Sequence, residues 1–216
     1  METPLSHAIG ETQRACDHVS FFVEGKVFEE LSPMDISKHN SLHLINVIEK
    51  LTKWLEDPLP EGPDAIDQIL KKEVVPDLVV YAVQIATAHA CNWLLAYRDT
   101  LHPDHHETVE NATSLDALVL LQSNIDLEND RNVPALAGAR RAIIAASAFL
   151  ARICDKDDHG TELPRDQIGS AVSSVLLREG LRLAKLFHGN LDELYAARVE
   201  DIKRKYGNVR IMLGKE

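Results

Sequence analysis

The chain has 216 residues, of which 45% are hydrophobic and 26% are charged, and its formal net charge is −11. This composition is ordinary for a soluble globular protein, and the length is enough to bury a large core. The acidic balance argues against a general nucleic-acid binder, because affinity for phosphate comes from clustered lysine and arginine. No apolar run reaches the roughly 18 to 20 residues that a membrane span needs, so we expect no membrane-spanning helix.

The three cysteines, Cys16, Cys91 and Cys154, lie far apart and form no Cys-x-x-Cys motif. The N-terminus has neither the basic region nor the apolar region of a secretory signal. We therefore expect reduced thiols in a cytoplasmic protein.

Helical periodicity dominates the first half of the chain. The helices expected there cover residues 5–23, 42–55, 64–72 and 76–98, with a Pro- and Gly-rich loop at 57–63. Pro76 fits the first turn of the last of these helices, because the N–H that proline lacks has no intrahelical partner there.

The second half is also helical. The helices expected there cover residues 115–125, 134–154, 165–188 and 191–207, with polar loops at 101–113 and 155–164. Thr113 or Ser114 is expected to cap the start of the first helix, and Asn190 the start of the last. Gly189 is expected to close the third helix and Gly207 the fourth.

The pattern as a whole predicts one all-α domain over residues 1–216, a bundle of seven to eight helices. Helices that are apolar on more than one side bury the surplus face against another helix or subunit, so we expect a homodimer. The Ala-rich helix over 134–154 has small residues that allow close packing, either in the core or between subunits.

Two carboxylates precede the most apolar segment of the chain. Glu73 and Asp77 are four residues apart, so they share a face if the helix begins before Pro76. Paired carboxylates suit Mg²⁺, which takes oxygen ligands and keeps waters for a phosphate substrate. The alternative is that these acids only stabilise a helix N-terminus. Pro76 favours the alternative, because proline disfavours helical geometry at Val75.

The segment from Asp77 to Ala86, DLVVYAVQIA, resembles the acidic helix of the MazG-like, all-α nucleoside triphosphate pyrophosphohydrolases. Asp77 and Tyr81 match the aspartate and the aromatic residue of that family, and Glu73 matches its first glutamate. Val74 stands where the second glutamate is usual. The resemblance implies a Mg²⁺-dependent enzyme that releases pyrophosphate from (d)NTPs or related nucleotides, with Glu73 and Asp77 as catalytic residues.

The C-terminal segment LAKLFHGNLDELYAARVEDIKRKYG is similar to the closing segment of the same family, where basic residues near a tyrosine help to hold the triphosphate. The resemblance implies that the nucleotide is bound by Lys203, Arg204, Lys205 and Tyr206. It also implies a metal site formed by Glu73 and Asp77, with Glu49 as the candidate for a third ligand.

Two other functions fit the sequence. Arg98 followed by His105 is similar to the short Arg-x4–6-His signature of HEPN-type ribonucleases, in which histidine acts as general acid or base. A non-enzymatic helical adaptor or interaction protein, with the acidic residues serving only the fold, is the other alternative.

Overall fold

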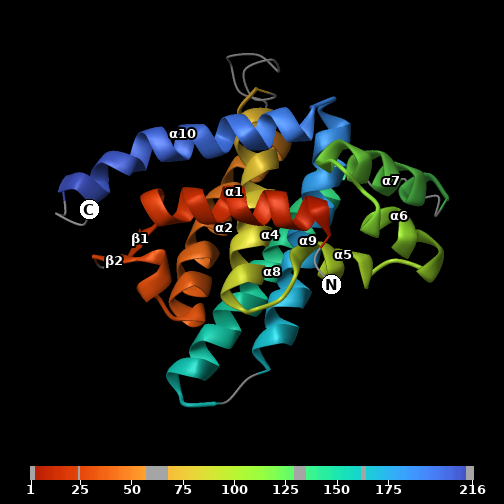
Figure 1. Ribbon diagram of the computed structural model, residues 1–216. Helices are drawn as coiled ribbons and strands as arrows, with labels where there is room; N and C mark the ends of the chain where they lie inside the picture. Colours follow the sequence, from red (N-terminus) through yellow and green to blue (C-terminus); the bar gives the residue numbers. More distant parts are fainter. Residues whose placement is uncertain (1–2, 24, 57–67, 129–134, 162–163, 213–216) are drawn as a thin grey trace.

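The computed structural model (Figure 1) describes residues 3–23, 25–56, 68–128, 135–161 and 164–212. Nine α-helices lie in these ranges, so the all-α bundle is confirmed and the expected number of seven to eight is slightly low. Their bounds are α1 Pro4–Ser20, α2 Pro33–Glu56, α4 Val75–Ala88, α5 Trp93–Arg98, α6 His106–Glu110, α7 Leu115–Glu128, α8 Ala135–Asp158, α9 Arg165–Leu186 and α10 Leu191–Met212.

Helix α4 forms the centre of the bundle. It carries one charged residue, Asp77, and almost all of its side chains are buried, as expected of a helix that is apolar on all sides. It packs against α9, α10, α2 and α1. Figure 1 shows α1 and α10 crossing over α4, with α6 and α7 at one side of the molecule. The core therefore surrounds the segment that the sequence singles out.

Helix α1 is shorter than the expected helix over 5–23. It starts at a capping box, in which the backbone N–H of Ser6 donates to Oγ1 of Thr3 and the N–H of Thr3 donates to Oγ of Ser6. After Ser20 the chain forms a two-stranded antiparallel hairpin, β1 Phe22–Val23 and β2 Lys26–Val27. Phe21 already has extended geometry, which ends the helix, and Gly25 has the positive φ of +79° that suits the turn of the hairpin.

A π-helical turn, η2 Leu70–Val74, leads directly into α4. Val75 has helical geometry, so Pro76 does not interrupt the chain as the sequence suggested, although it lies in the first turn of α4 as predicted. In a regular helix the proline ring would meet the carbonyl of Lys72. The wider turn, in which the N–H of Val75 donates to the carbonyl of Leu70, relieves that contact. Glu73 and Asp77 therefore lie on one continuous helical path.

The single helix expected over 76–98 is wrong, because the chain breaks between α4 and α5. Ala90 has a positive φ of 55°, and Oδ1 of Asn92 accepts hydrogen bonds from the N–H groups of Leu94 and Leu95. Helix α9 passes this break at Gly169, where an added Cβ would lie only 2.7 Å from Cβ of His89.

Two of the expected loops contain helical structure. Residues 101–113 include the 3₁₀-helix η3 Pro103–His105 and the short helix α6, and α8 extends to Asp158. The chain leaves α8 at Gly160, whose φ is +73°. The expected loop at 57–63 lies outside the described residues, as do residues 64–67 of the helix expected over 64–72, whereas residues 68–72 are helical as predicted.

The N-termini of α7 and α10 cap each other. Asp192 accepts hydrogen bonds from the N–H groups of Leu115 and Asp116, and Asp116 accepts one from Leu191 at 2.7 Å. The local caps are also as predicted, with Ser114 accepting from Ala117 and Asn190 from Glu193.

The predicted ends of α9 and α10 need correction. His188, and not Gly189, takes the left-handed backbone conformation after α9, with φ at 48°. Gly189 is instead a point of close approach, where an added Cβ would lie 2.6 Å from Cδ1 of Leu194. Helix α10 continues through Gly207 to Met212, because one glycine lowers helix stability by only about 1 kcal/mol.

Candidate functional site

Asp77 forms a buried ion pair with Arg198 of α10. The Asp77 residue is 4% exposed. Nε of Arg198 donates to Oδ1 at 2.6 Å, and Nη2 donates to Oδ2 at 3.0 Å. Burial raises the pKa of Asp77, while the guanidinium opposes that shift. Both carboxylate oxygens are therefore engaged by one planar cation, the strongest form of this contact.

Glu73 lies beside this pair and contacts a different cation. Its Oε2 accepts a hydrogen bond from Nζ of Lys50 on α2 at 2.5 Å. The contact with Lys50 lowers the pKa of Glu73, and the charges of Arg198 and Lys205 act in the same direction. Lys50, Glu73, Asp77 and Arg198 form one group, called here the Asp77 cluster, at the junction of α2, η2, α4 and α10.

Glu49 does not join the Asp77 cluster through an ion pair. Its carboxylate is exposed and pairs with Lys53 on the same helix at 2.6 Å. Each of the three acids predicted to bind metal therefore faces its own cation. In the described part of the chain, no group of three His, Cys, Asp or Glu side chains is arranged to hold a metal ion. In this arrangement the carboxylates are occupied by cations of the chain itself, and magnesium binding stays a prediction.

The predicted nucleotide-binding residues follow one another along α10. Lys203 pairs with Glu200 at 2.8 Å, and Arg204 pairs with Asp201 at 2.6 Å. Lys205 lies 5.1 Å from the ring centre of the fourth residue, Tyr206. Of these four, Lys205 is the one whose charge acts on Glu73. Lys203 and Arg204 thus pair with acids of α10 itself, and nucleotide binding by these four residues stays a prediction.

A row of rings adjoins the Asp77 cluster. It runs from Phe28 to Phe21, His39, His43 and Tyr81, with successive ring centres 5.2, 4.5, 4.4 and 5.9 Å apart. Burial lowers the pKa of His39 to about 4 and also lowers the pKa of His43. The charges of Asp77 and Arg198 act on His43 with opposite signs. The row therefore connects the hairpin region to the cluster.

A second buried aspartate, Asp17 of α1, contacts α4 through Gln84. Nε2 of Gln13 and Nε2 of Gln84 donate to its Oδ1 at 2.8 and 2.6 Å, and the hydroxyl of Tyr195 donates to Oε1 of Gln13 at 2.9 Å. Burial raises the pKa of Asp17 to about 7. Gln84 and Asp77 are seven residues apart on α4, and so share a face. The sequence analysis missed this network.

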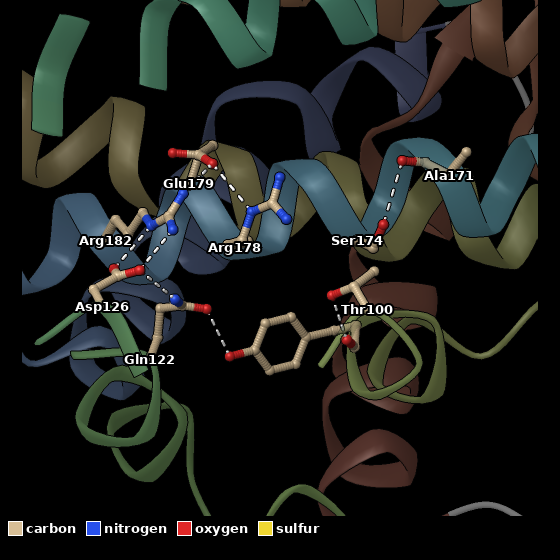
Figure 2. A network of polar contacts seen from close by, with 9 residues as sticks. Thr100, Gln122, Asp126, Ala171, Ser174, Arg178, Glu179 and Arg182 are labelled. Atoms are coloured by element: carbon tan, nitrogen blue, oxygen red, sulfur yellow. Dashed lines mark hydrogen bonds and ion pairs between the residues drawn. The ribbon is translucent and has the colours of Figure 1, made fainter. Parts of the chain in front are cut away.

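A third polar network joins α7 to α9, and the sequence analysis missed it as well. Figure 2 shows Arg182 between two carboxylates, with hydrogen bonds of 2.9 and 2.6 Å to Asp126 and 2.8 Å to Glu179. Gln122 donates to Asp126 and accepts from the hydroxyl of Tyr97. The one local signal was the spacing of Glu179 and Arg182, one helical turn apart. These paired charges brace two helices, and we assign the network to the fold.

The residues of the ribonuclease hypothesis lie at the surface. The guanidinium of Arg98 donates to Asp99 at 2.8 and 2.7 Å and also pairs with Glu110. His105 ends the short helix η3. With its guanidinium facing two carboxylates, Arg98 is poorly placed to receive a phosphate, and this hypothesis stays a prediction.

Comparison with protein-family models, with curated proteins and with solved structures finds no match to this chain. The similarity to MazG-like enzymes therefore rests on the quoted sequence residues alone. Among the described helices, none is long and apolar enough to cross a bilayer.

Proposed function

We propose that this chain is a helical interaction protein that pairs with a second copy of itself through α8. The observation that carries the proposal is the outward face of α8, which has small and apolar side chains around one arginine in the middle and opposite charges at its two ends. The acids that suggested an enzyme are, by contrast, each paired with a cation.

The middle of this face consists of small and apolar side chains together with the exposed Arg152. Ile144 is 43% exposed, and Ala145, Ala148 and Ala151 are also exposed. The opposite face of α8 packs against α2 and α9. Exposed apolar patches on protein surfaces often mark sites of protein–protein interaction.

The neighbouring helix α2 adds to the same surface. It runs antiparallel to α8, since Lys38 contacts Asp158 at 2.6 Å and Thr52 contacts Arg140 at 3.4 Å. Ile45 lies seven residues from both Lys38 and Thr52, on the same side of α2, and is 54% exposed. Ile45 therefore adds an exposed apolar side chain on the side of α2 that faces α8.

The charges on α8 favour a second copy as the partner. Arg140 and Arg141 lie near the start of the helix, and three acids, Asp155, Asp157 and Asp158, lie with Lys156 at its end. The two arginines and the three acids are placed against the helix dipole, so they do not serve the stability of the isolated helix. Two antiparallel α8 helices would place the basic end of each against the acidic end of the other.

A two-fold axis at Ala148 satisfies this pairing. Arg141 and Asp155 are each seven residues from Ala148, so they share its face. Arg141 of one copy would then meet Asp155 of the second copy, and Asp155 of the first would meet Arg141 of the second. Arg141 makes no ion pair with any residue that the structure describes. The small side chain at position 148 would let the two helices approach closely.

Sedimentation equilibrium of charge variants tests the dimer. Ala148→Glu sets two like charges on the axis and should weaken self-association more than about tenfold, since a tenfold change needs only 1.4 kcal/mol. Arg141→Glu and Asp155→Arg should each weaken it, and the double variant should restore it. Lys185→Glu, an exposed reversal on α9, is the matched control. A monomeric wild type, or a double variant no better than the singles, would contradict the proposal.

A nucleotide pyrophosphohydrolase is the second function that we propose. It is supported by the basic residue Lys205, whose charge contributes to the lowered pKa of Glu73. Glu73 also lies within reach of the charge on Asp77. Release of pyrophosphate from a panel of (d)NTPs in Mg²⁺ tests it, with Glu73→Gln expected to abolish turnover and Glu49→Gln serving as comparison. No turnover together with no Mg²⁺ binding by calorimetry would remove it. We assign both functions to the cytoplasm, on the reduced state of the cysteines.

A further inference from the structure

We propose that His39 and His43 form a two-nitrogen chelating site for a divalent transition metal of the Zn²⁺, Cu²⁺ and Ni²⁺ class. Imidazole suits these ions, whereas Mg²⁺ prefers oxygen ligands. The site is separate from the α8 surface and needs neither of the proposed functions.

The spacing and the ring geometry suit one shared ion. His39 and His43 are four residues apart on α2, so their side chains lie on the same face. Their ring centres are 4.4 Å apart, with the planes inclined by 53°. Two imidazoles that bind one zinc ion, each with a Zn–N bond of about 2.0–2.1 Å, have ring centres roughly 5 Å apart. A small rotation of the two rings is therefore enough to chelate an ion.

The ring nitrogens are available. Within the described ranges, no group forms a hydrogen bond with either imidazole, and both residues are only partly buried. None of their ring nitrogens is among the fully buried side-chain atoms without a partner, so an ion from solution can reach both imidazoles.

Two neighbouring aromatic rings limit the movement of the His39 and His43 side chains. The Phe21 ring lies 4.5 Å from His39, and the Tyr81 ring lies 5.9 Å from His43. Fixed orientation of the ligands is what neighbouring side chains contribute to natural metal sites. The other coordination positions would be taken by water, since no third protein ligand completes the site in the described part of the chain.

His102, in the loop before α6, and His106, the first residue of α6, make a matched control. Nδ1 of His102 accepts from the N–H of Asp104, and Nε2 of His106 lies 3.3 Å from the carbonyl of Leu101. They are as close in sequence as His39 and His43, yet one nitrogen of each ring already has a partner. We therefore expect metal binding at the α2 pair and not at the loop.

Calorimetry of the full chain without a polyhistidine tag, titrated with Zn²⁺, tests the site. We expect one ion per chain. His39→Gln and His43→Gln should each lower the affinity by more than about tenfold, because even loss of an outer-shell partner costs 10- to 100-fold. His102→Gln/His106→Gln should bind as the wild type does, and so should the dimer variant Ala148→Glu. Circular dichroism checks that each variant is folded.

Electron paramagnetic resonance of the Cu²⁺-loaded protein identifies the ligand atoms directly, so its result does not depend on a comparison of affinities. Two imidazole nitrogens should appear in the spectrum, and one should disappear in His43→Gln. Absence of Zn²⁺ binding by the wild type would overturn the proposal. So would binding that survives His39→Gln/His43→Gln and is lost in the loop variant.

Discussion

Two buried aspartates, Asp77 of α4 and Asp17 of α1, have different kinds of hydrogen-bond partner. They are 4% and 2% exposed. Asp77 meets a guanidinium with both oxygens, whereas Asp17 receives hydrogen bonds only from the amides of Gln13 and Gln84. Burial raises the pKa of both, and only Asp77 has a cation that opposes the shift.

The difference shows that burial alone does not decide the charge of a carboxylate. A buried ionised group needs a partner of opposite charge, and amides compensate it only in part. Asp77 is therefore one half of an ion pair whose two members depend on each other. Asp17 takes up a proton near neutral pH and behaves as a neutral hydrogen-bonding group below it.

Removal of the cation from the first pair should have the largest effect. Arg198→Ala leaves Asp77 buried without a partner, and we expect it to lower the free energy of unfolding by about 3–5 kcal/mol. Urea denaturation measures the change. Arg204→Ala, which removes an exposed arginine from the same helix, should change stability by less than about 0.5 kcal/mol. A similar, small effect of both variants would show that the buried pair is not needed.

Removal of the anion should have a smaller effect. In Asp77→Asn, Arg198 keeps a contact with Asp201 at 3.3 Å and lies closer to the surface than Asp77 does. We expect a loss of about 1–3 kcal/mol, again by urea denaturation. A larger loss of stability in Asp77→Asn than in Arg198→Ala would contradict this prediction, because it would mean that Arg198 needs its partner more than Asp77 does.

Asp17→Asn should stabilise the protein above neutral pH. The pKa of Asp17 is about 7 in the folded state and about 3.9 in the unfolded chain, so its contribution is full below pH 4 and is lost as pH rises to about 7. Asparagine keeps the acceptor oxygen without the charge. We expect a gain on the order of 1–3 kcal/mol at pH 8 that shrinks toward pH 5. Urea denaturation at four pH values measures it, and a difference independent of pH would contradict the assignment.

The smallest effect is expected at the edge of the Asp77 cluster. Lys50→Ala removes the ion pair with Glu73, whose side chain is partly exposed, and should lower stability by less than about 1 kcal/mol. Half a molar salt should reduce that loss further, because exposed pairs are screened. The denaturation midpoint in low and high salt measures both. A loss as large as that of Arg198→Ala would mean that Lys50 belongs to the buried part of the cluster.

Local features of the fold were predictable from sequence. Apolar periodicity located most of the helices, and the caps at Ser114 and Asn190 follow from residue type. The break after α4 had a signal in Asn92, a good N-cap, that the apolar pattern on either side obscured. The π turn before Pro76 had none, because the same proline is compatible with a helix start or a helix end.

The candidate sites were predictable only in part. Glu73 and Asp77 belong to one segment, so their proximity could be inferred. Arg198 lies 121 residues from Asp77, and no spacing rule links them. The same holds for Gln84 and Asp17, which are 67 residues apart. Partners supplied by distant helices decide whether an acid is a metal ligand, half of an ion pair or a proton acceptor.

Helix α10 follows the other described helices along the chain, so it is synthesised after them, and it contacts α1, α4 and α7. It supplies Arg198 to Asp77, Tyr195 to Gln13 and Asp192 to the start of α7. Proteins are synthesised from the N-terminus at about 5–20 residues per second. Until α10 has been made, Asp77 therefore lacks Arg198 and α7 lacks the distant half of its cap. We expect the bundle to reach its final packing only after α10 has been synthesised, as a single cooperative step.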